Sequence, residues 1–514
     1  MMMERARPAA LSSASSATAA SSRSSSTPRR LAPRRASAAR MQASAAPAST
    51  PKVIVAGGGI AGLATTLACQ TKGLDVTCYE RVREYKPWGG PIQMAGNAMA
   101  ALDICDPSAA AAIVGDGTVT GDRLNGLLDG KDGDWFVRFD CRKPALESGL
   151  PLTVVMNRYD VIEKMTARVS PGALRQGVEV MRYEELPGGR VRVHLSDGAT
   201  DECDVLVAAD GIRSRCRSQM MDAPPLEKNL DKMVGGVPDA PTYSGYTCYA
   251  AISRMTPADV DTVGYMVFLG AGQYFVSSDV GDGQQQWYAF VKQDAGMDDE
   301  GADRKAALLE AFADWCPAVR ERLEAVVSEE VERRDIYDRP PTLQWCKGRV
   351  ALLGDAAHAM QPNMGQGGCQ AIEDAAALAD ELAKVGPDGV ERALGWYQAR
   401  RIPRAAAITG FAASASLMTS TYRRYLGSDP YFFYQYIPGA LFFWEQVRKL
   451  KIPHPGRIVG QIAMLSSIDL ILMYITTMGD QRDSVKPLLE GQKKVMRELD
   501  DGLFAMKGIW GLAK

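Results

Sequence analysis

Histidine is scarce in this chain, and the scarcity removes several kinds of enzyme. Three histidines occur among 514 residues, at positions 194, 358 and 454, and each is isolated from the others. Most histidine-based metal sites and a serine hydrolase triad are therefore not expected, and we predict no metal site. The ten cysteines include no CxxC pair, so we expect them to be ordinary, reduced core residues.

Acidic residues are almost missing from the first fifty positions. Glu4 is the one acid there, against eight arginines in a background of Ser, Ala and Pro. This composition cannot build a core and is typical of an organelle transit peptide, which we predict for residues 1–50. A disordered linker is the alternative. A secretory signal would need an apolar run near the start, and this segment has none.

The remainder of the chain is mildly acidic. The whole chain carries a net charge of −2, of which the first fifty residues contribute +7, so the rest carries −9. A nucleic-acid partner is not expected from such a balance. The apolar stretch 458–478 is interrupted by Gln461 and Asp469, which argues against a membrane-spanning helix.

The stretch 53–69 is the most informative in the sequence. An apolar strand runs into three spaced glycines, Gly57, Gly59 and Gly62, and then into a helix. The first glycine allows a tight turn, the second admits a pyrophosphate, and the third lets the helix pack close to the strand. The helix N-terminus adds partial positive charge. A second strand, 75–80, ends in Glu80, where a carboxylate can hold ribose hydroxyls. The pattern predicts a dinucleotide site.

Two later stretches place polar residues at the ends of strands. Residues 150–165 read as a strand that turns into a helix with Arg158 at the junction, where a cation could face a cofactor or cap a sheet edge. Residues 203–217 form a buried strand that breaks at Asp210 and Gly211. Ligands bind at the carboxyl ends of parallel strands, although an ordinary strand-to-loop turn would look the same.

A third motif spans 347–374. An apolar strand is followed by Gly354 and Asp355, then Pro362, and then a glycine-rich entry into a helix. The glycines of that entry are Gly365, Gly367 and Gly368. The helix start presents free N–H groups and a positive dipole end, which would stabilise negative charge on a ligand. One face of the helix is apolar, with Ile372, Ala376, Ala379 and Leu382.

Residues 243–290 alternate apolar and polar side chains, with turns at 270–272 and 281–283. We predict an antiparallel sheet that roofs the cofactor site. Five aromatic residues of this segment are candidates to line a substrate tunnel, although about half must face elsewhere because side chains alternate along a strand. They are Tyr246, Tyr274, Phe275, Trp287 and Tyr288.

The region 422–457 is rich in aromatic residues, which are followed by several Lys and Arg residues. Aromatic side chains with flanking Lys and Arg suit the headgroup zone of a membrane, and packing into the core is the alternative. The sequence leaves both interpretations open.

Three motifs occur in order: GxGxxG with Glu80, Asp210-Gly211 with Arg217, and Gly354-Asp355 with Pro362. This ordered set resembles the single-component flavoprotein monooxygenases with the p-hydroxybenzoate hydroxylase fold. Within that group, several further stretches resemble the zeaxanthin epoxidase family. They are 242–249, 267–279, 286–290, 333–338, 360–369 and 453–457. Cys369 stands where phenol-hydroxylating relatives usually carry Asn, which favours the carotenoid branch.

The resemblance implies an α/β fold with a Rossmann-like FAD-binding domain, an inserted antiparallel-sheet substrate domain and a C-terminal helical region. We place the FAD-binding domain at 51–118, 150–238 and 336–400, the substrate domain at 119–149 and 239–335, and the helical region at 401–514.

The resemblance also implies roles for individual residues. FAD is bound by Gly57, Gly59, Gly62 and Glu80, with Pro362, Gly365, Gly367 and Gly368 in the third motif. Arg158 lies near the flavin, Asp210 and Gly211 bridge toward NADPH, and Asp355 holds the ribityl chain. The chain departs from the pattern at Gly89, where land-plant members usually carry Arg. Those members usually end in a forkhead-associated domain, which we do not expect in residues 1–514, so phosphopeptide-type partners are not carried over.

The implied activity is epoxidation of the ring double bond of xanthophylls with NADPH and O2, through a flavin hydroperoxide. Because alkenes need no base to activate them, we name no catalytic side chain. The alternatives are a hydroxylase of phenolic or quinoid substrates, a related xanthophyll-modifying oxygenase, and a flavin- and carotenoid-binding protein without turnover. The expected partners are the carotenoid, a membrane surface touched peripherally, and a reductase or ferredoxin as a candidate electron donor. The expected location is the chloroplast, on the stromal side of the thylakoid or envelope membrane.

Overall fold

The structure is a computed structural model that describes residues 49–87, 89–226, 239–297, 302–423, 449–451, 455–476 and 485–497. Its centre is a six-stranded sheet in the order β18-β19-β12-β1-β2-β8. All neighbours pair in parallel except β18 and β19. The strands are β1 (Lys52–Ala56), β2 (Asp75–Glu80), β8 (Leu174–Gln176), β12 (Val205–Ala208), β18 (Cys346–Lys347) and β19 (Val350–Leu352).

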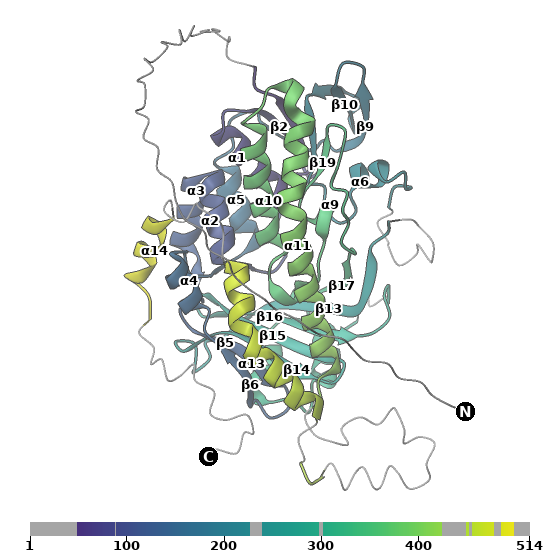
Figure 1. Cartoon of the computed structure of the whole chain (residues 1–514). Coiled ribbons are helices and arrows are strands. Elements are labelled where there is room, and N and C mark those ends of the chain that lie inside the picture. Colours follow the sequence, from purple (N-terminus) through teal and green to yellow (C-terminus); the bar gives the residue numbers. More distant parts are fainter. Residues whose placement is uncertain are drawn as a thin grey trace, which may run out of the picture. The chain divides into compact units, whose positions relative to one another are not determined.

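Helices cover this sheet and explain why its strands are continuous apolar runs. Val53, Ile54 and Val55 of the central strand are fully buried, as expected where both faces of a parallel sheet are covered. Figure 1 shows α1, α10 and α11 side by side. The helices of this part are α1 (Ile60–Thr71), α2 (Gly96–Cys105), α3 (Pro107–Asp116), α5 (Arg158–Thr166), α6 (Arg215–Met220), α9 (Asp355–His358), α10 (Gly367–Leu382) and α11 (Val390–Thr421), with the 3-10 turns η3 (Pro362–Met364) and η4 (Pro387–Gly389).

Two small three-stranded sheets flank the central one. The first is a hairpin of β9 and β10 with one added strand, in the order β11-β10-β9, and the second has the order β3-β7-β4. Their strands are β9 (Val180–Leu186), β10 (Arg190–Leu195), β11 (Thr200–Cys203), β3 (Ile92–Met94), β7 (Val154–Met156) and β4 (Thr118–Val119).

The predicted roof is a seven-stranded sheet in the order β17-β13-β16-β15-β14-β5-β6. Its turns at residues 270–272 and 281–283 are confirmed, since β14 and β15, and β15 and β16, pair as hairpins around them. The sheet is not purely antiparallel, because β5 pairs in parallel with β14. These two strands are far apart in sequence, so no hairpin dictates their direction. The strands are β5 (Leu124–Asp129), β6 (Trp135–Phe139), β13 (Thr242–Arg254), β14 (Val263–Gly270), β15 (Gln273–Gly281), β16 (Gln284–Lys292) and β17 (Glu332–Asp338).

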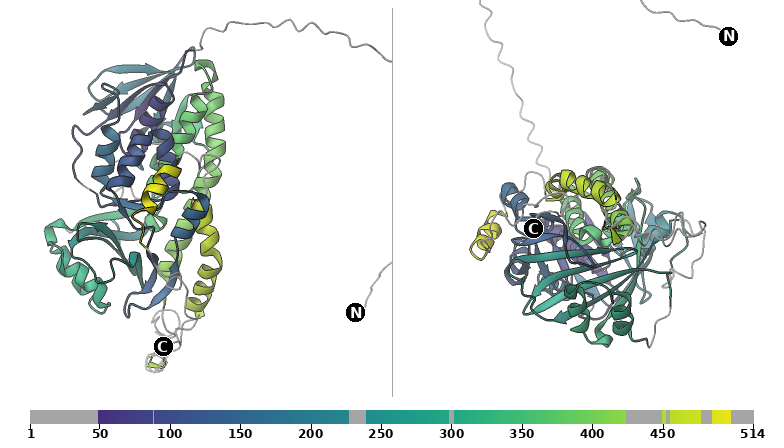
Figure 2. Two further views of the ribbon diagram at one scale, coloured as in Figure 1. Left: turned by 90° about the vertical axis from the view of Figure 1, so that its left-hand side faces the viewer. Right: turned by 90° about the horizontal axis from the view of Figure 1, so that it is seen from below.

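The two faces of this sheet divide the candidate aromatic residues. Phe275 and Trp287 stack at 5.5 Å between ring centroids on the face covered by α7 (Arg304–Ala311), α8 (Pro317–Glu324) and η2 (Ser328–Glu330). Figure 2 shows these helices at the lower left of its left-hand view. Tyr246 and Tyr274 belong to a separate cluster, against which Tyr288 packs. Because side chains alternate along a strand, Phe275 and Trp287 cannot lie on the face that carries this second cluster.

The C-terminal part is helical, as expected. It comprises the end of α11, then α13 (Pro455–Thr476) and α14 (Lys486–Lys493), and the small helix α4 (Arg142–Ser148) lies beside α13. Helix α11 runs unbroken across residue 400. Among the described residues, no helix combines the length and apolarity that crossing a membrane requires. Most of the aromatic cluster predicted at 422–444 lies outside the described residues, and Tyr422, which is described, is buried.

Candidate cofactor site

The first motif forms a cradle at the carboxyl end of β1. Gly57 has φ +98°, and a Cβ there would lie 2.5 Å from the carbonyl oxygen of Ala209. A Cβ on Gly62 would lie 1.8 Å from the carbonyl oxygen of Gly57, so the turn and the helix approach each other too closely for any side chain. A Cβ on Gly59 would meet no atom within 4 Å. The first and third glycines are thus required by the protein backbone, whereas the second faces open space where a phosphate fits.

Glu80 stands at the end of β2 beside this cradle. Its Oε2 accepts a hydrogen bond from the Gly58 N–H at 2.6 Å, and its Oε1 accepts from the Val82 N–H at 2.9 Å. Tyr85, which the sequence did not single out, donates its hydroxyl to the Gly58 carbonyl at 2.7 Å. Glu80 and Tyr85 together fix the loop, and the contact of Glu80 with a ribose stays a prediction.

Asp210 and Gly211 follow β12, the parallel neighbour of β1, and therefore lie at the same edge of the sheet. One carboxylate oxygen of Asp210 accepts from the N–H groups of Arg215 and Cys216, at 2.9 and 3.3 Å. The other is buried and has no hydrogen-bond partner among the described residues. Burial raises the pKa of Asp210. A buried acceptor without a partner is a position that a ligand hydroxyl can satisfy.

A buried arginine joins the second motif to the third. Arg217 is 1% exposed, and its Nη1 donates to the carbonyl oxygens of Ala356 and Ala357 at 2.9 and 2.8 Å. Its remaining nitrogens bind the carboxylate of Asp239 at 2.6 and 2.7 Å. Arg217 thereby holds the turn after β12 against the turn after β19.

A second buried arginine shares that carboxylate. Arg339 donates to Asp239 Oδ2 at 3.1 Å and to the carbonyl oxygen of Ile212 at 2.8 Å. Burial and the neighbouring Arg217 lower the pKa of Arg339 to about 10, so the group is still charged at neutral pH. Sequence reasoning missed Arg339 and Asp239 because neither belongs to a spaced motif.

The third motif lies where it was expected. Gly354 (φ +61°) leads into α9, whose first residue, Asp355, is exposed. The carboxylate of Asp355 lies 4.0 Å from the position of a Cβ on Gly367. Pro362 opens η3, Gly365 closes it with φ +61°, and Gly367 and Gly368 begin α10. The four predicted apolar positions of α10 are buried.

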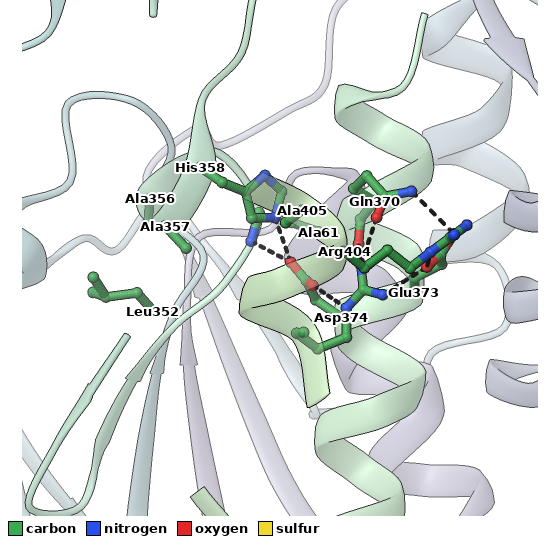
Figure 3. Close-up of polar contacts among 12 residues, drawn as sticks. Ala61, Leu352, Ala356, Ala357, His358, Gln370, Glu373, Asp374, Arg404 and Ala405 are labelled. Atoms are coloured by element: carbon green, nitrogen blue, oxygen red, sulfur yellow. Dashed lines mark hydrogen bonds and ion pairs between the residues drawn. The ribbon is translucent and has the colours of Figure 1, made fainter. Parts of the chain in front are cut away.

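Behind this motif, charged side chains form a buried network (Figure 3). His358 Nε2 and the Gly354 N–H contact Asp374 Oδ2 at 2.6 and 3.1 Å. Arg401 donates to Asp374 and Glu373, both at 2.6 Å. Burial raises the pKa of Asp374, but the charges of His358 and Arg401 outweigh it and lower the value to about 2. The network fixes α10 and α11 to the turn that carries Asp355.

Arg158, the first residue of α5, is exposed and lies near Gly89. Its Cδ lies 3.4 Å from the position that a Cβ on Gly89 would take, and the guanidinium of Arg334 lies 3.6 Å from the same point. The side chains of two cations, Arg158 and Arg334, therefore both approach Gly89.

The arrangement fits FAD. Three motifs far apart in sequence meet at one edge of a parallel sheet, and they supply a phosphate cradle, an unsatisfied carboxylate oxygen and the N-terminus of α10. Among the described residues, no cluster of His, Cys, Asp and Glu could hold a metal ion.

Two profiles described as FAD binding domain match residues 161–412 and 52–110. Among solved structures, Klebsiella pneumoniae HpxO complexed with FAD and uric acid aligns with a TM-score of 0.64 and 23% identity, over 82% of this chain and 97% of that one. A salicylate hydroxylase substrate complex aligns with a TM-score of 0.60 and 20% identity, over 86% and 98%. These likenesses show the fold that the sequence predicted, and the profile matches make the chain an FAD-binding protein of that fold.

Curated relatives narrow the assignment. Zeaxanthin epoxidase, chloroplastic, of Oryza sativa subsp. japonica is 43% identical over 482 residues, which are 90% of this chain and 69% of that protein. The proteins of the same name from Nicotiana plumbaginifolia and Solanum lycopersicum are 43% and 42% identical over 82% and 87% of this chain, which spans 62% and 64% of their lengths. The chain belongs to the zeaxanthin epoxidase family.

Proposed function

We propose that this protein epoxidises the ring double bond of xanthophylls such as zeaxanthin, with NADPH and O2 as co-substrates. One oxygen atom enters the double bond and the other leaves as water, while NADPH gives up two electrons. The main support for this function is the 43% identity to a zeaxanthin epoxidase across 90% of the chain. The three cofactor motifs are also intact. FAD, once bound, supplies the activated oxygen.

In this proposal the residues of the chain bind FAD, orient the substrate beside it and shield both from water. The glycine turn would hold the pyrophosphate, with Gly57 and Gly62 shaping the turn and Gly59 leaving room for a phosphate, and Asp355 would hold the ribityl chain. Tyr274 of the seven-stranded sheet contacts Asn363 of the third motif, and Tyr246 packs edge-on against Tyr274. This face of the sheet would shield bound FAD from water. No side chain is assigned as an acid or base, because an alkene has no proton to remove before it reacts.

A substrate panel tests this function. The protein without residues 1–50, loaded with FAD, is supplied with NADPH and either zeaxanthin in micelles or simple phenols, and the products are separated by chromatography and mass spectrometry. Zeaxanthin should gain one and then two oxygen atoms, while the phenols should be unchanged. Hydroxylated phenol without any epoxide would support the alternative hydroxylase. A parallel assay with ferredoxin and its reductase in place of direct NADPH identifies the electron donor.

We also propose that the protein works in the chloroplast and touches the stromal face of a thylakoid or envelope membrane, where a C40 xanthophyll resides. Exposed apolar side chains gather on α13, where Val459, Ile462 and Met473 are 66, 49 and 51% exposed. Their spacing places them on one face of the helix. Lys449 and Lys451, also exposed, precede the helix. An apolar face beside cations suits the surface of an anionic bilayer.

Co-sedimentation with anionic liposomes tests the membrane contact. Val459→Asp with Ile462→Asp should reduce the bound fraction several-fold and leave FAD in place. Trp396→Asp, at another exposed apolar position (63% exposed), is the matched control and should bind like the parent. Equal sedimentation of all three proteins would contradict the contact. Phe432 and Phe433 belong to the region 422–457, for which the sequence leaves membrane contact and core packing both open, and they lie outside the described residues.

A further inference from the structure

Asn363 occupies a position between the cofactor motif and the roof. It is the middle residue of η3, directly after Pro362 and two residues before Gly365. The turn is closed by a hydrogen bond from the Gly365 N–H to the Pro362 carbonyl at 2.9 Å. The backbone of Asn363 is therefore held rigidly beside the N-terminus of α10.

The side chain of Asn363 reaches across to the roof. Its Nδ2 donates to the hydroxyl of Tyr274 on β15 at 3.2 Å. That hydroxyl stays protonated at physiological pH, because burial raises the pKa of Tyr274 well above its usual range. The tyrosine oxygen accepts this hydrogen bond, which ties the amide of Asn363 to the roof.

The oxygen of the same amide is left without a partner. Asn363 Oδ1 is buried and accepts no hydrogen bond from any described residue. A buried acceptor left unpaired costs about 1–3 kcal/mol. A buried acceptor without a partner, held beside the start of α10, can accept a hydrogen bond from a ligand donor.

The surroundings of Asn363 are aromatic. Tyr274 stacks on Phe290 at 4.2 Å between ring centroids and meets Tyr246 edge-on at 5.6 Å. Tyr288, on the strand beside, donates its hydroxyl to the Pro91 carbonyl at 2.8 Å, which joins this wall to the loop after Gly89. An aromatic wall beside the unpaired oxygen of Asn363 suits a ring that carries a hydroxyl.

We propose that Asn363 is the specificity-determining residue for the hydroxyl group on the end ring of the substrate, and that its Oδ1 accepts a hydrogen bond from that hydroxyl. The assignment rests on the proposed function, since in a hydroxylated xanthophyll the hydroxyl and the reacting double bond share one six-membered ring. Anchoring the hydroxyl places the double bond. A carotene ring without the hydroxyl would leave the acceptor unpaired and bind less tightly.

Ligand affinity and turnover test the assignment together. Dissociation constants for zeaxanthin and β-carotene are measured with the FAD-loaded protein by quenching of flavin fluorescence, and epoxide formation is followed separately. Asn363→Leu should weaken zeaxanthin binding about tenfold and leave β-carotene binding within about twofold of the parent. Asn363→Asp keeps an acceptor oxygen and should retain most of the preference. Tyr274→Phe removes the hydroxyl that holds the Asn363 amide and should reduce the preference for zeaxanthin in part.

The outcomes separate this assignment from the proposed function. In one outcome the parent protein forms epoxide and Asn363→Leu keeps the parent's preference for zeaxanthin. This outcome would overturn the role of Asn363 but would not affect the proposed function. Asn363→Leu that loses its FAD would also overturn it, because the oxygen would then serve the cofactor. A parent protein that binds and epoxidises neither carotenoid would contradict the function and the assignment with it.

Discussion

Arg217 and Ala357 lie 140 positions apart, yet Nη1 of the arginine donates to the alanine carbonyl at 2.8 Å inside the protein. The bond joins the turn that carries Asp210 to the turn that carries Asp355. We propose that both turns serve one cofactor, so the proposed site depends on a contact between protein groups.

Removing this arginine should therefore weaken FAD binding. Arg217→Met deprives two buried carbonyls of their donor and leaves Asp239 with a single guanidinium, and breaking a buried ion pair typically costs about 3–5 kcal/mol. We expect FAD affinity to fall at least tenfold in fluorescence titrations of the apoprotein. The control is Arg215→Met, since Arg215 pairs with Glu179 in a partly exposed bridge. Equal affinities for both variants would contradict the role of Arg217.

Gly59 and Gly62 should respond differently to the same substitution. Gly59→Val adds a side chain in open space, so the apoprotein should melt near the parent temperature but retain no FAD. Gly62→Val pushes a Cβ onto the Gly57 carbonyl and should destabilise the fold itself. Thermal melting and the flavin absorbance of the purified variants distinguish the two. Gly59→Val with the parent's flavin content would refute the phosphate cradle.

Arg404 links the cofactor domain to the C-terminal helix. It pairs with Glu373 at 2.6 Å and donates to the carbonyls of Tyr474 and Ile475 at 2.7 and 2.8 Å, at the end of α13. Arg404→Met should lower the free energy of unfolding by about 3 kcal/mol and speed amide exchange in α13. Arg400→Met, which removes half-exposed bridges of 3.8 and 3.9 Å, should change it by less than about 1 kcal/mol. Unchanged exchange in α13 would show that Arg404 does not hold this helix.

Asp374 should make stability depend on acid pH. Its pKa is about 2 in the folded protein, against about 3.9 in an unfolded chain. A depressed folded value stabilises the protein above the unfolded pKa, and this stabilisation is lost as the pH falls from about 4 toward 2. The contribution is on the order of 2 kcal/mol. Urea midpoints of the parent and of Asp374→Asn should converge over that range. A constant difference between them would contradict the assignment.

The sequence predicted the cofactor motifs because each is local. A strand, a glycine turn and a helix start are encoded within a few residues, and parallel pairing then brings their ends to one edge. The predicted fold class, the FAD and the family are confirmed by the structure and by the relatives.

The supports of the site could not be predicted in the same way. Arg339 meets Asp239 across 100 positions, and Arg401 meets Asp374 across 27, without any spacing that marks them. Alternation along β15 and β16 could show that Tyr274 and Phe275 face opposite ways, but not which of them faces the cofactor. That choice depends on where α7 and α8 pack, which no local pattern encodes.

The most direct test of the central claim follows the oxygen atom. The FAD-loaded protein is supplied with zeaxanthin, NADPH and ¹⁸O2, and the product is examined by mass spectrometry and NMR. The proposed function predicts one ¹⁸O atom in each ring epoxide and one NADPH oxidised per epoxide formed. NADPH oxidation without labelled epoxide, under conditions in which a phenol is hydroxylated, would contradict it.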